Sequence, residues 1–400
     1  MSATSLSSGG ANITGTTAQM PSGPTAPLEH APLSNQVPEP SHRPAPRRLF
    51  VISVVAALLG LGITLSFGYA EHDPKPHEVR VAVAAAPAVR DKVAARLQRA
   101  QPGGFDLVSY ATAAGATQSV RSQASAGALI VPPNGALTIV TAGAAGVLQQ
   151  QAVTAALTGA SKPMHRPATL LDIAPLSSGD RSGLSSFVFG LGLLLPSVIG
   201  GVGIFLLGMR LRLWWRVAAA TLFALLAACG GVLALDTVLG ALSGAGGALI
   251  GIGFLGALSF VLFVVALQAV VGLPGTALAA FAFIFVGNAI SGGPVPVDFL
   301  PGGFRQVAPW LPNNAIVRGA RDVVYFNGRD LAHPLLVLCM WSAGALSVLV
   351  AVDLVHISER RRQARTAHDI YRTPAVVHLG RRMAARRARV AVVPAQRPPL

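Results

Sequence analysis

Residues Phe187 to Met209 read FVFGLGLLLPSVIGGVGIFLLGM, which is 23 residues without a charged side chain. A helix needs about 20 mostly apolar residues to cross the hydrocarbon core of a bilayer. A helix also satisfies its backbone hydrogen bonds internally, and this is required where water is absent. We therefore predict a transmembrane helix here, in preference to a buried helix of a water-soluble core.

Further apolar runs lie on both sides of this stretch. One precedes it at residues 49–70, and four follow it. The four end near Leu235, Val271, Asn288 and Ile357, and the last of them begins at Pro334. The predicted fold class is a polytopic α-helical membrane protein with six transmembrane helices, arranged as one plus five. The five lie within residues 186–357.

Composition and charge agree with a membrane protein. Of the 400 residues, 52% are hydrophobic and 12% are charged, against about 25% charged in an average globular protein. The net charge is +15, and a large share of it comes from arginines after Ile357. Cations that follow a span favour the cytoplasmic side and attract anionic lipid. We expect lipid contact of this basic cytoplasmic tail, residues 358–400, and no nucleic-acid partner.

The charges around the first span predict the topology. Four basic or titratable residues, His42, Arg43, Arg47 and Arg48, precede it, while Glu71 and Asp73 follow it. The N-terminus is therefore expected inside, with residues 71–185 outside and both termini in the cytoplasm. Residues 1–48 are rich in Ser, Gly, Thr and Pro and predict a disordered cytoplasmic tail. The first span is interpreted as a signal anchor, and a cleaved signal peptide is the alternative.

The stretch between the first two spans alternates between strand and helix patterns. Strands are expected at 79–84, 105–110, 128–131 and 136–140, and helices at 87–100, 112–126 and 146–157. The last two strands are joined by the turn Pro132-Pro133-Asn134-Gly135. We predict a small extracytoplasmic α/β domain. Its histidines, His72, His77 and His165, are scattered near its edges and are expected to be solvated.

Catalytic chemistry has little support in this sequence. It has no nucleotide-binding P-loop, no metal-ligand cluster and no nucleophile elbow, so we expect no enzyme activity, metal or cofactor. The two cysteines, Cys229 and Cys339, fall in apolar spans and predict no disulfide framework. Within the spans only Asp353 and His356 can titrate, and both lie near the end of the last span. An ion-coupled carrier usually needs such a group near the midplane, so this function is disfavoured.

Glycines are frequent in the spans and predict close helix packing, within the chain or between protomers. They are Gly192, Gly200, Gly201, Gly203, Gly246, Gly247, Gly251, Gly253 and Gly256.

One segment before the last span carries a loose motif of proline, glycine and aromatic residues. It includes Ser291, Gly292, Gly293, Pro296, Pro301, Pro309, Pro312, Arg318, Arg321 and Tyr325. This motif resembles the corresponding loop in permeases of the type 2 ATP-binding-cassette (ABC) exporter superfamily, in the branch of phage-infection-protein-like membrane proteins. The one-plus-five order of spans is also similar, as is the entry to the second span with Asp180, Gly183 and Phe187.

The resemblance implies a permease that pairs, as a homodimer or with a second permease, and binds two cytoplasmic ATPase subunits. It implies that residues 291–333 form an outer re-entrant segment, with an ordinary surface loop as the alternative. It also implies that the turn of Arg210, Leu211, Arg212 and Trp214 contacts the ATPase, although these residues equally suit positive-inside anchoring. One departure is that Pro38, Pro40, Pro44 and Pro46 disfavour the amphipathic helix that precedes the first span in related exporters.

The favoured function is therefore an exporter permease that moves an amphipathic or hydrophobic compound with ATP hydrolysed by another chain. The alternative is a non-transporting scaffold or secretion component whose outer domain binds an envelope partner. Heavy use of Arg over Lys, with frequent Ala and Gly, indicates a GC-rich source such as an actinobacterium. The resemblance to bacterial permeases implies a bacterial plasma membrane.

Overall fold

The computed structural model describes residues 46–372, 382–384 and 386–387. The chain divides into two units, residues 1–52 and 53–400, and of the first only the helical residues 46–52 are described. The predicted disordered tail, residues 1–48, lies almost wholly outside the described residues. So does most of the basic tail after residue 372.

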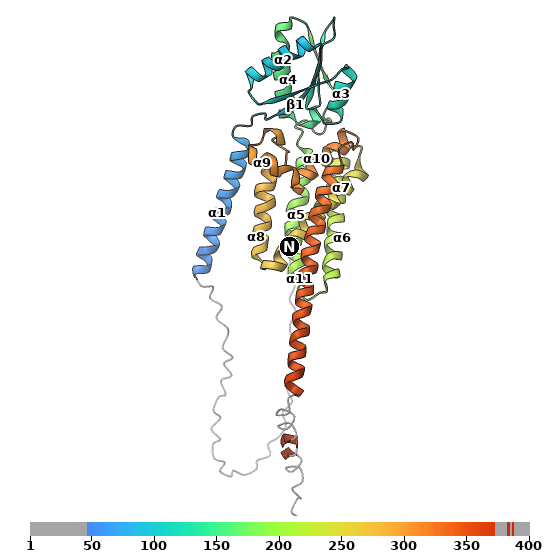
Figure 1. Cartoon of the computed structure of the whole chain (residues 1–400). Coiled ribbons are helices and arrows are strands. Elements are labelled where there is room, and N and C mark those ends of the chain that lie inside the picture. Colours follow the sequence, from blue (N-terminus) through green and yellow to red (C-terminus); the bar gives the residue numbers. More distant parts are fainter. Residues whose placement is uncertain (1–45, 373–381, 385, 388–400) are drawn as a thin grey trace, which may run out of the picture. The chain divides into compact units, whose positions relative to one another are not determined.

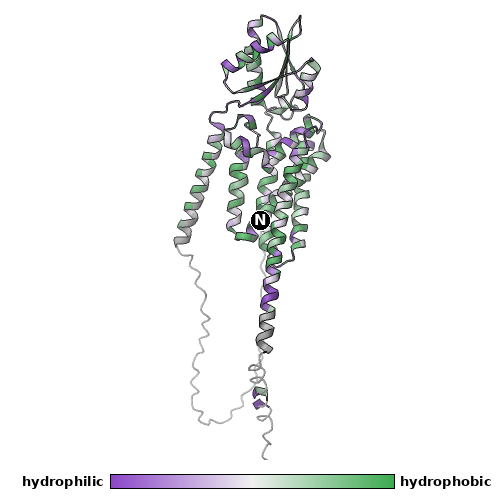
Figure 2. Ribbon diagram, viewed as in Figure 1, coloured by the Kyte–Doolittle hydropathy of each residue, from purple (hydrophilic) through white to green (hydrophobic). Residues whose placement is uncertain are grey.

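Among the described residues, four helices are long and apolar enough to cross a membrane. They are α5 (Ser185–Gly208), α6 (Leu213–Val232) continued by the π-helix η3 (Leu233–Val238), α7 (Gly246–Val271) and α11 (Ala332–Arg372). Figure 2 shows apolar residues along these helices. Large apolar side chains also point outward, and Ile199 and Leu207 are 75% and 85% exposed. Such exposure is expected where lipid replaces water, so the chain is a multi-pass helical membrane protein.

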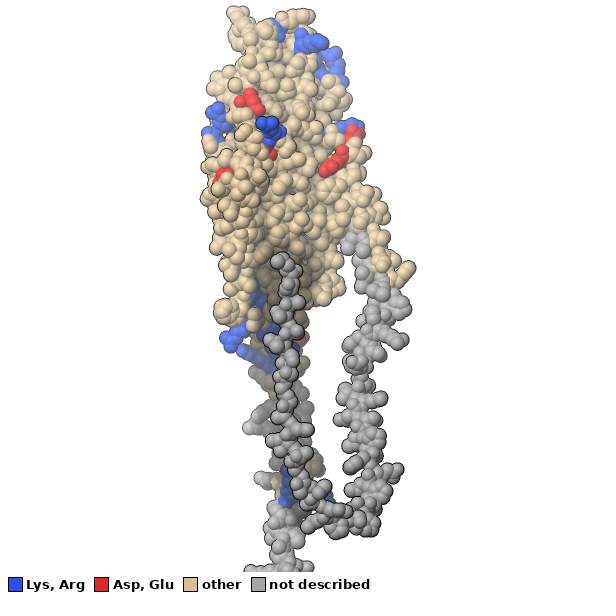
Figure 3. Space-filling model, turned by 180° about the vertical axis from the view of Figure 1, so that it is seen from behind, with Lys and Arg blue, Asp and Glu red and all other residues tan. Residues whose placement is uncertain are grey.

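The charged residues also fit a bilayer. On the face seen in Figure 3, a broad band over the helices carries no Lys, Arg, Asp or Glu, and charged groups lie beyond both of its edges. A charge in the hydrocarbon core is costly, so its exclusion from this band is the pattern that a bilayer requires.

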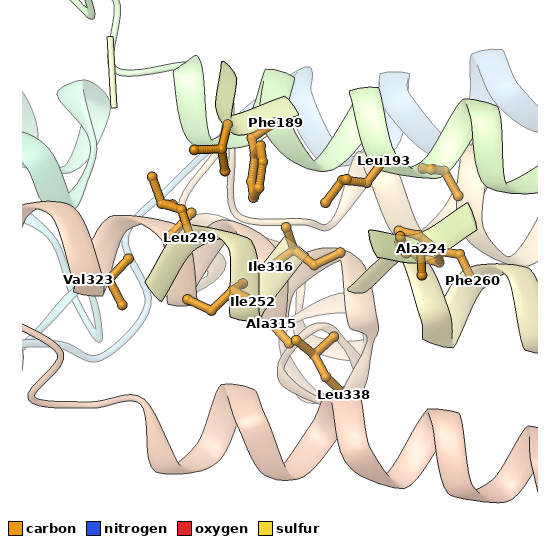
Figure 4. Close-up of a cluster of buried hydrophobic side chains, with 14 of the residues drawn as sticks. Phe189, Leu193, Ala224, Leu249, Ile252, Phe260, Ala315, Ile316, Val323 and Leu338 are labelled. Carbon is orange, nitrogen blue, oxygen red and sulfur yellow. The ribbon is translucent and has the colours of Figure 1, made fainter. Parts of the chain in front are cut away.

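Helix α7 is the centre of the helical part. It packs against α5, α6, α11 and α10 (Pro312–Tyr325). Figure 4 shows Phe189 and Leu193 of α5, Ile252 and Phe260 of α7, and Ile316 of α10 in one apolar cluster. α7 is accordingly the most buried of the four candidate spans.

Two further helices complete this part. α1 (Pro46–Glu71) has 26 residues, close to the predicted first span. The predicted fifth span is a shorter element, in which α8 (Pro274–Ala280) and the π-helix η4 (Phe281–Gly287) form one helix of 14 residues, called the short helix below. Ser66 Oγ of α1 donates a hydrogen bond to the carbonyl oxygen of Phe285, 3.1 Å away. At 1.5 Å per residue the short helix covers about 21 Å, less than the roughly 30 Å of a bilayer core.

The α/β domain contains one five-stranded sheet in the order β2-β1-β3-β4-β5. The strands are β1 (Val79–Ala84), β2 (Phe105–Ser109), β3 (Gly127–Ile130), β4 (Leu137–Thr141) and β5 (Ala168–Asp172). Only β3 and β4 pair antiparallel, and the other neighbours are parallel. Helices α2 (Pro87–Ala100) and α4 (Val147–Ser161) cover one face of the sheet, and α3 (Ala113–Arg121) covers the other (Figure 1).

Most predicted elements of this domain are present, with two corrections. β1 and α2 have the predicted bounds, and β3 and β4 form the predicted hairpin, with Gly135 at φ +92° in its turn. The helix expected over 112–126 ends at Arg121, because Gln123 adopts φ +58°, which a helix cannot continue. β5 was not predicted. In the helical part, α11 extends beyond the expected end at Ile357 to Arg372, because the arginine-rich sequence there is a good helix former.

Candidate functional site

Residues 288–331, between the short helix and α11, form what we call the connecting segment. It contains η5 (Val297–Phe299), α9 (Gly302–Val307), η6 (Ala308–Trp310) and α10. Of the residues singled out in the sequence, Ser291, Gly292, Gly293, Pro296 and Pro312 are buried. Pro301, Pro309, Arg318 and Tyr325 are half-buried, and Arg321 is buried. These residues therefore belong to a packed element with its own helices.

The two adjacent glycines explain how the segment packs so closely. Gly292 has φ +77°, a conformation that favours glycine. A Cβ on Gly293 would lie 2.6 Å from the ring of Phe187, at the start of α5. The backbone of the segment packs directly against the Phe187 ring because Gly293 carries no side chain.

Arg321 is the polar centre of the segment and is 8% exposed. A guanidinium has five N–H donors, and five hydrogen bonds are present. The acceptors are Ser186 Oγ (3.1 Å) and the carbonyl oxygens of Ala145 (3.3 Å), Gly183 (3.3 Å), Gly292 (2.8 Å) and Gly293 (3.1 Å). Arg321 thereby connects α10 with the α/β domain, the entry to α5 and the glycine pair.

The charge of Arg321 is stabilised by hydrogen bonds to neutral groups and by the nearby buried carboxylate of Asp180. No Asp or Glu of the described residues forms an ion pair with it. A guanidinium keeps its proton in proteins, so Arg321 remains a cation at neutral pH. Its five donors are already used, so we assign it a structural role and not a ligand-binding one. Arg321 belongs to the predicted motif, but no pattern in the sequence indicates that it is buried.

Amide and carboxylate side chains of α10 anchor the rest of the segment. Asn313 Nδ2 donates to the carbonyl oxygen of Phe283 (3.0 Å), and Asn314 Nδ2 donates to that of Ser291 (2.9 Å). Gln123 of the α/β domain donates from Nε2 to Asp322 Oδ1 (2.9 Å). The segment is thus tied to the short helix on one side and to the α/β domain on the other.

The depth of α10 follows from its contacts with α7. A Cβ on Gly256 would lie 2.6 Å from Cδ1 of Ile316, so the two helices touch there. Gly256 lies near the middle of α7, about 15 Å along the axis from its start at Gly246. α10 therefore occupies the half of the bundle that the short helix does not reach.

A cavity of about 290 Å³ lies between the connecting segment and the α/β domain. Its polar lining includes Gln123, Ser125, Asn314 and Arg318. The hydroxyl of Ser125 is buried and has no hydrogen-bond partner among the described residues. His77, expected to be solvated, is half-buried and lines a neighbouring polar hollow. Neither residue was predicted to belong to a site.

The predicted ATPase-contact turn lies at the other end of α5 and α6. Arg210, Leu211, Arg212 and Trp214 are all exposed. The indole rings of Trp214 and Trp215 stack with centroids 3.8 Å apart. A hollow of about 1090 Å³, called the arginine hollow below, opens beside the turn. Of the predicted site residues, the structure groups these four around one hollow and the other ten along the connecting segment.

The described residues contain no group of three or more His, Cys, Asp or Glu placed to hold a metal ion. Comparison with family models, curated proteins and solved structures gives no match. The fold and these two regions define the class of protein as a multi-pass helical membrane protein that contains a small α/β domain.

Proposed function

We propose that this chain is a permease subunit of an ABC-type exporter in a bacterial plasma membrane, with six spans and both termini in the cytoplasm. It pairs with a second permease and moves an amphipathic or hydrophobic compound with ATP hydrolysed by a separate subunit. The proposal rests on the resemblance of the connecting segment to the loop before the last span in such permeases.

One observation supports it best. The short helix ends well before the far end of α7, and α10 occupies the remaining depth against Gly256. Irregular backbone is tolerated at membrane depth only where protein or a watery cavity covers it. The buried and hydrogen-bonded residues around Ser291 and Arg321 meet that condition, as a re-entrant segment must.

Helix α5 also links the proposed ATPase-contact turn to the connecting segment. The turn at Arg210 joins α5 to α6, and α5 begins beside Gly183 and Ser186, which accept hydrogen bonds from Arg321. A displacement of α5 by an ATPase at the turn would therefore act on the connecting segment and, through Ala145, on the α/β domain.

The scaffold function is favoured by a different observation. β5 is an edge strand of the sheet, and its Leu170 and Leu171 are 53% and 46% exposed. An open edge with apolar side chains is a template for strand addition by another protein. If no ATPase binds, an envelope partner at β5 is the function to test.

Affinity purification of the tagged protein in mild detergent, with an ATPase assay, tests the proposal. We expect a nucleotide-binding subunit to copurify with vanadate-sensitive activity. The double variant Arg210→Glu, Arg212→Glu should lose this subunit while still inserting in the membrane. Arg361→Glu is the matched control, because Arg361 is exposed on α11 and does not line the hollow.

Recovery of the protein without an ATPase would overturn the permease proposal. Retention of the ATPase by the double variant would overturn only the assignment of the turn.

A further inference from the structure

The arginine hollow is a cationic site at one end of the helical part. Its lining comes from the end of α5, the turn, the start of α6, the end of α7 and α11. It contains four arginines, Arg210, Arg212, Arg216 and Arg360, and one carboxylate, Asp353. Four guanidinium groups around one carboxylate leave an excess of positive charge, which suits an anionic ligand.

The contacts of Arg216 show that its side chain is held in a defined position in the lining of the hollow. A Cβ on Gly208 would lie 2.9 Å from Cγ of Arg216, so the stem of this arginine rests on the end of α5. Its Nη2 lies 3.4 Å from Asp353 Oδ1, which is a long contact for an ion pair. Its Nε is buried and has no partner among the described residues. One donor of a partly buried cation is thus left for a ligand.

The start of α6 adds further donors. The helix begins at Leu213, and no side chain of the described residues caps it. The first N–H groups of a helix lack intrahelical partners and carry the positive end of the helix dipole. Together with the arginines they form the kind of environment that binds phosphate.

Gln268 places a second requirement on the ligand, in addition to negative charge. This residue is 1% exposed and lines the same hollow. Its Nε2 donates to Thr276 Oγ1 (2.6 Å), while its Oε1 has no partner among the described residues. An amide oxygen needs a donor, and a fully deprotonated phosphate ester has none. A headgroup with both a phosphate and hydroxyl groups satisfies the arginines and Gln268 together.

Apolar residues continue from the hollow onto the surface of the helices. Phe205, Val217, Val352 and Ile357 line it, and two apolar residues of the lining, Met209 and Ile357, are 62% and 41% exposed. Tryptophans such as Trp214 and Trp215 are typical of the membrane interface. The ligand therefore needs apolar chains as well as a phosphate.

We propose that the arginine hollow binds one anionic glycerophospholipid with a hydroxyl-bearing headgroup, of the phosphatidylglycerol type. The phosphate lies among Arg210, Arg216, Arg360 and the start of α6, and a headgroup hydroxyl donates to Gln268. This site goes beyond the proposed function, because it requires no ATPase and no transported substrate.

Native mass spectrometry of the delipidated full chain, titrated with phosphatidylglycerol, phosphatidic acid or phosphatidylcholine, tests the site. We expect one phosphatidylglycerol to bind in preference to phosphatidylcholine. The double variant Arg210→Gln, Arg360→Gln should bind it about 30-fold more weakly, since each cation near an anionic headgroup contributes about fivefold. Arg361→Gln is the control and should change affinity less than about twofold.

Gln268→Leu separates the headgroup from the phosphate. This variant should lose the preference for phosphatidylglycerol over phosphatidic acid and keep its affinity for phosphatidic acid. Thermal unfolding of each variant in detergent checks that it is folded. An equal loss in Arg361→Gln, or equal binding of phosphatidylcholine, would overturn the proposal. Displacement of the lipid by millimolar inorganic phosphate would also overturn it, because the site would then take free phosphate.

Discussion

Glycines of a single helix differ in what surrounds them. On α7, a Cβ at Gly256 would meet Cδ1 of Ile316 at 2.6 Å, while a Cβ at Gly251 would have nothing within 4 Å. Gly247 on the same helix is open in the same way, as are Gly192 and Gly203 on α5. The sequence predicted close helix packing at all of these positions. Within this chain, close contact occurs only at some, including Gly200, Gly201, Gly253 and Gly256.

The substitution Gly256→Ala should therefore destabilise the protein by about 1–3 kcal/mol, because Ile316 is buried and must shift to make room. Gly251→Ala is the control on the same helix. It should be neutral or stabilising by about 0.5–1 kcal/mol, because glycine is a poorer helix former than alanine. Unfolding in mixed detergent micelles measures both variants. Similar destabilisation by the two would contradict the contact between α7 and α10.

Arg321 lies at the junction of three parts of the chain. Arg321→Lys keeps the charge but supplies three donors for five acceptors, so buried carbonyl groups lose their partners. We expect a loss of about 3 kcal/mol in the free energy of unfolding. Hydrogen exchange should also quicken around Ala145, Gly183 and the pair Gly292 and Gly293, which all accept from Arg321.

The matched control is Arg318→Lys, on the same helix. Arg318 is half-buried and pairs with Asp330, a contact that lysine can also make. Its expected cost is under about 1 kcal/mol. If Arg321→Lys changes stability no more than this control, Arg321 does not have the structural role assigned to it.

At the scale of elements, the connecting segment is where sequence and structure differ in detail. The prolines correctly predicted that no continuous helix crosses residues 291–333. They left open whether the segment is a surface loop or a re-entrant element. Its depth depends on the contact of Ile316 with Gly256, which no local pattern encodes.

Trp310 of the segment offers a direct measurement, because it is 51% exposed and only four tryptophans occur in the chain. In a variant with the other three replaced by phenylalanine, Trp310 should be quenched by brominated lipids and protected from iodide in water. A variant that keeps only Trp214 serves as the interfacial reference. Strong quenching of Trp310 by iodide alone would indicate a surface loop.

At the scale of the whole molecule, hydrogen bonds between distant residues pair the helix ends. Ser177 Oγ, before α5, donates to the carbonyl oxygen of Ala241, between α6 and α7 (2.7 Å). Arg216 and Asp353 pair the start of α6 with the later part of α11. α5, α6 and α7 therefore alternate in direction, as the predicted topology requires.

The sidedness can be measured with introduced cysteines and a membrane-impermeant maleimide. Ala113→Cys, exposed at the start of α3, should be labelled in intact cells, because the charge pattern predicts the α/β domain outside. Arg361→Cys should be labelled only after permeabilisation. The native Cys229 and Cys339 lie in apolar helices and should react slowly from water. The reverse pattern would invert the topology.

The sequence by itself determined the membrane class, most element bounds and the α/β character of the small domain. Those features follow from local periodicity and from long uncharged runs, which need no knowledge of distant residues. The tertiary structure decided the burial of Arg321, the position of β5 at the sheet edge and the packing of α10 against α7. It also brought four arginines from α11 and from around the α5–α6 turn together in one hollow. Each of these depends on contacts between residues far apart in the chain, and a single sequence carries no periodic signal for such contacts.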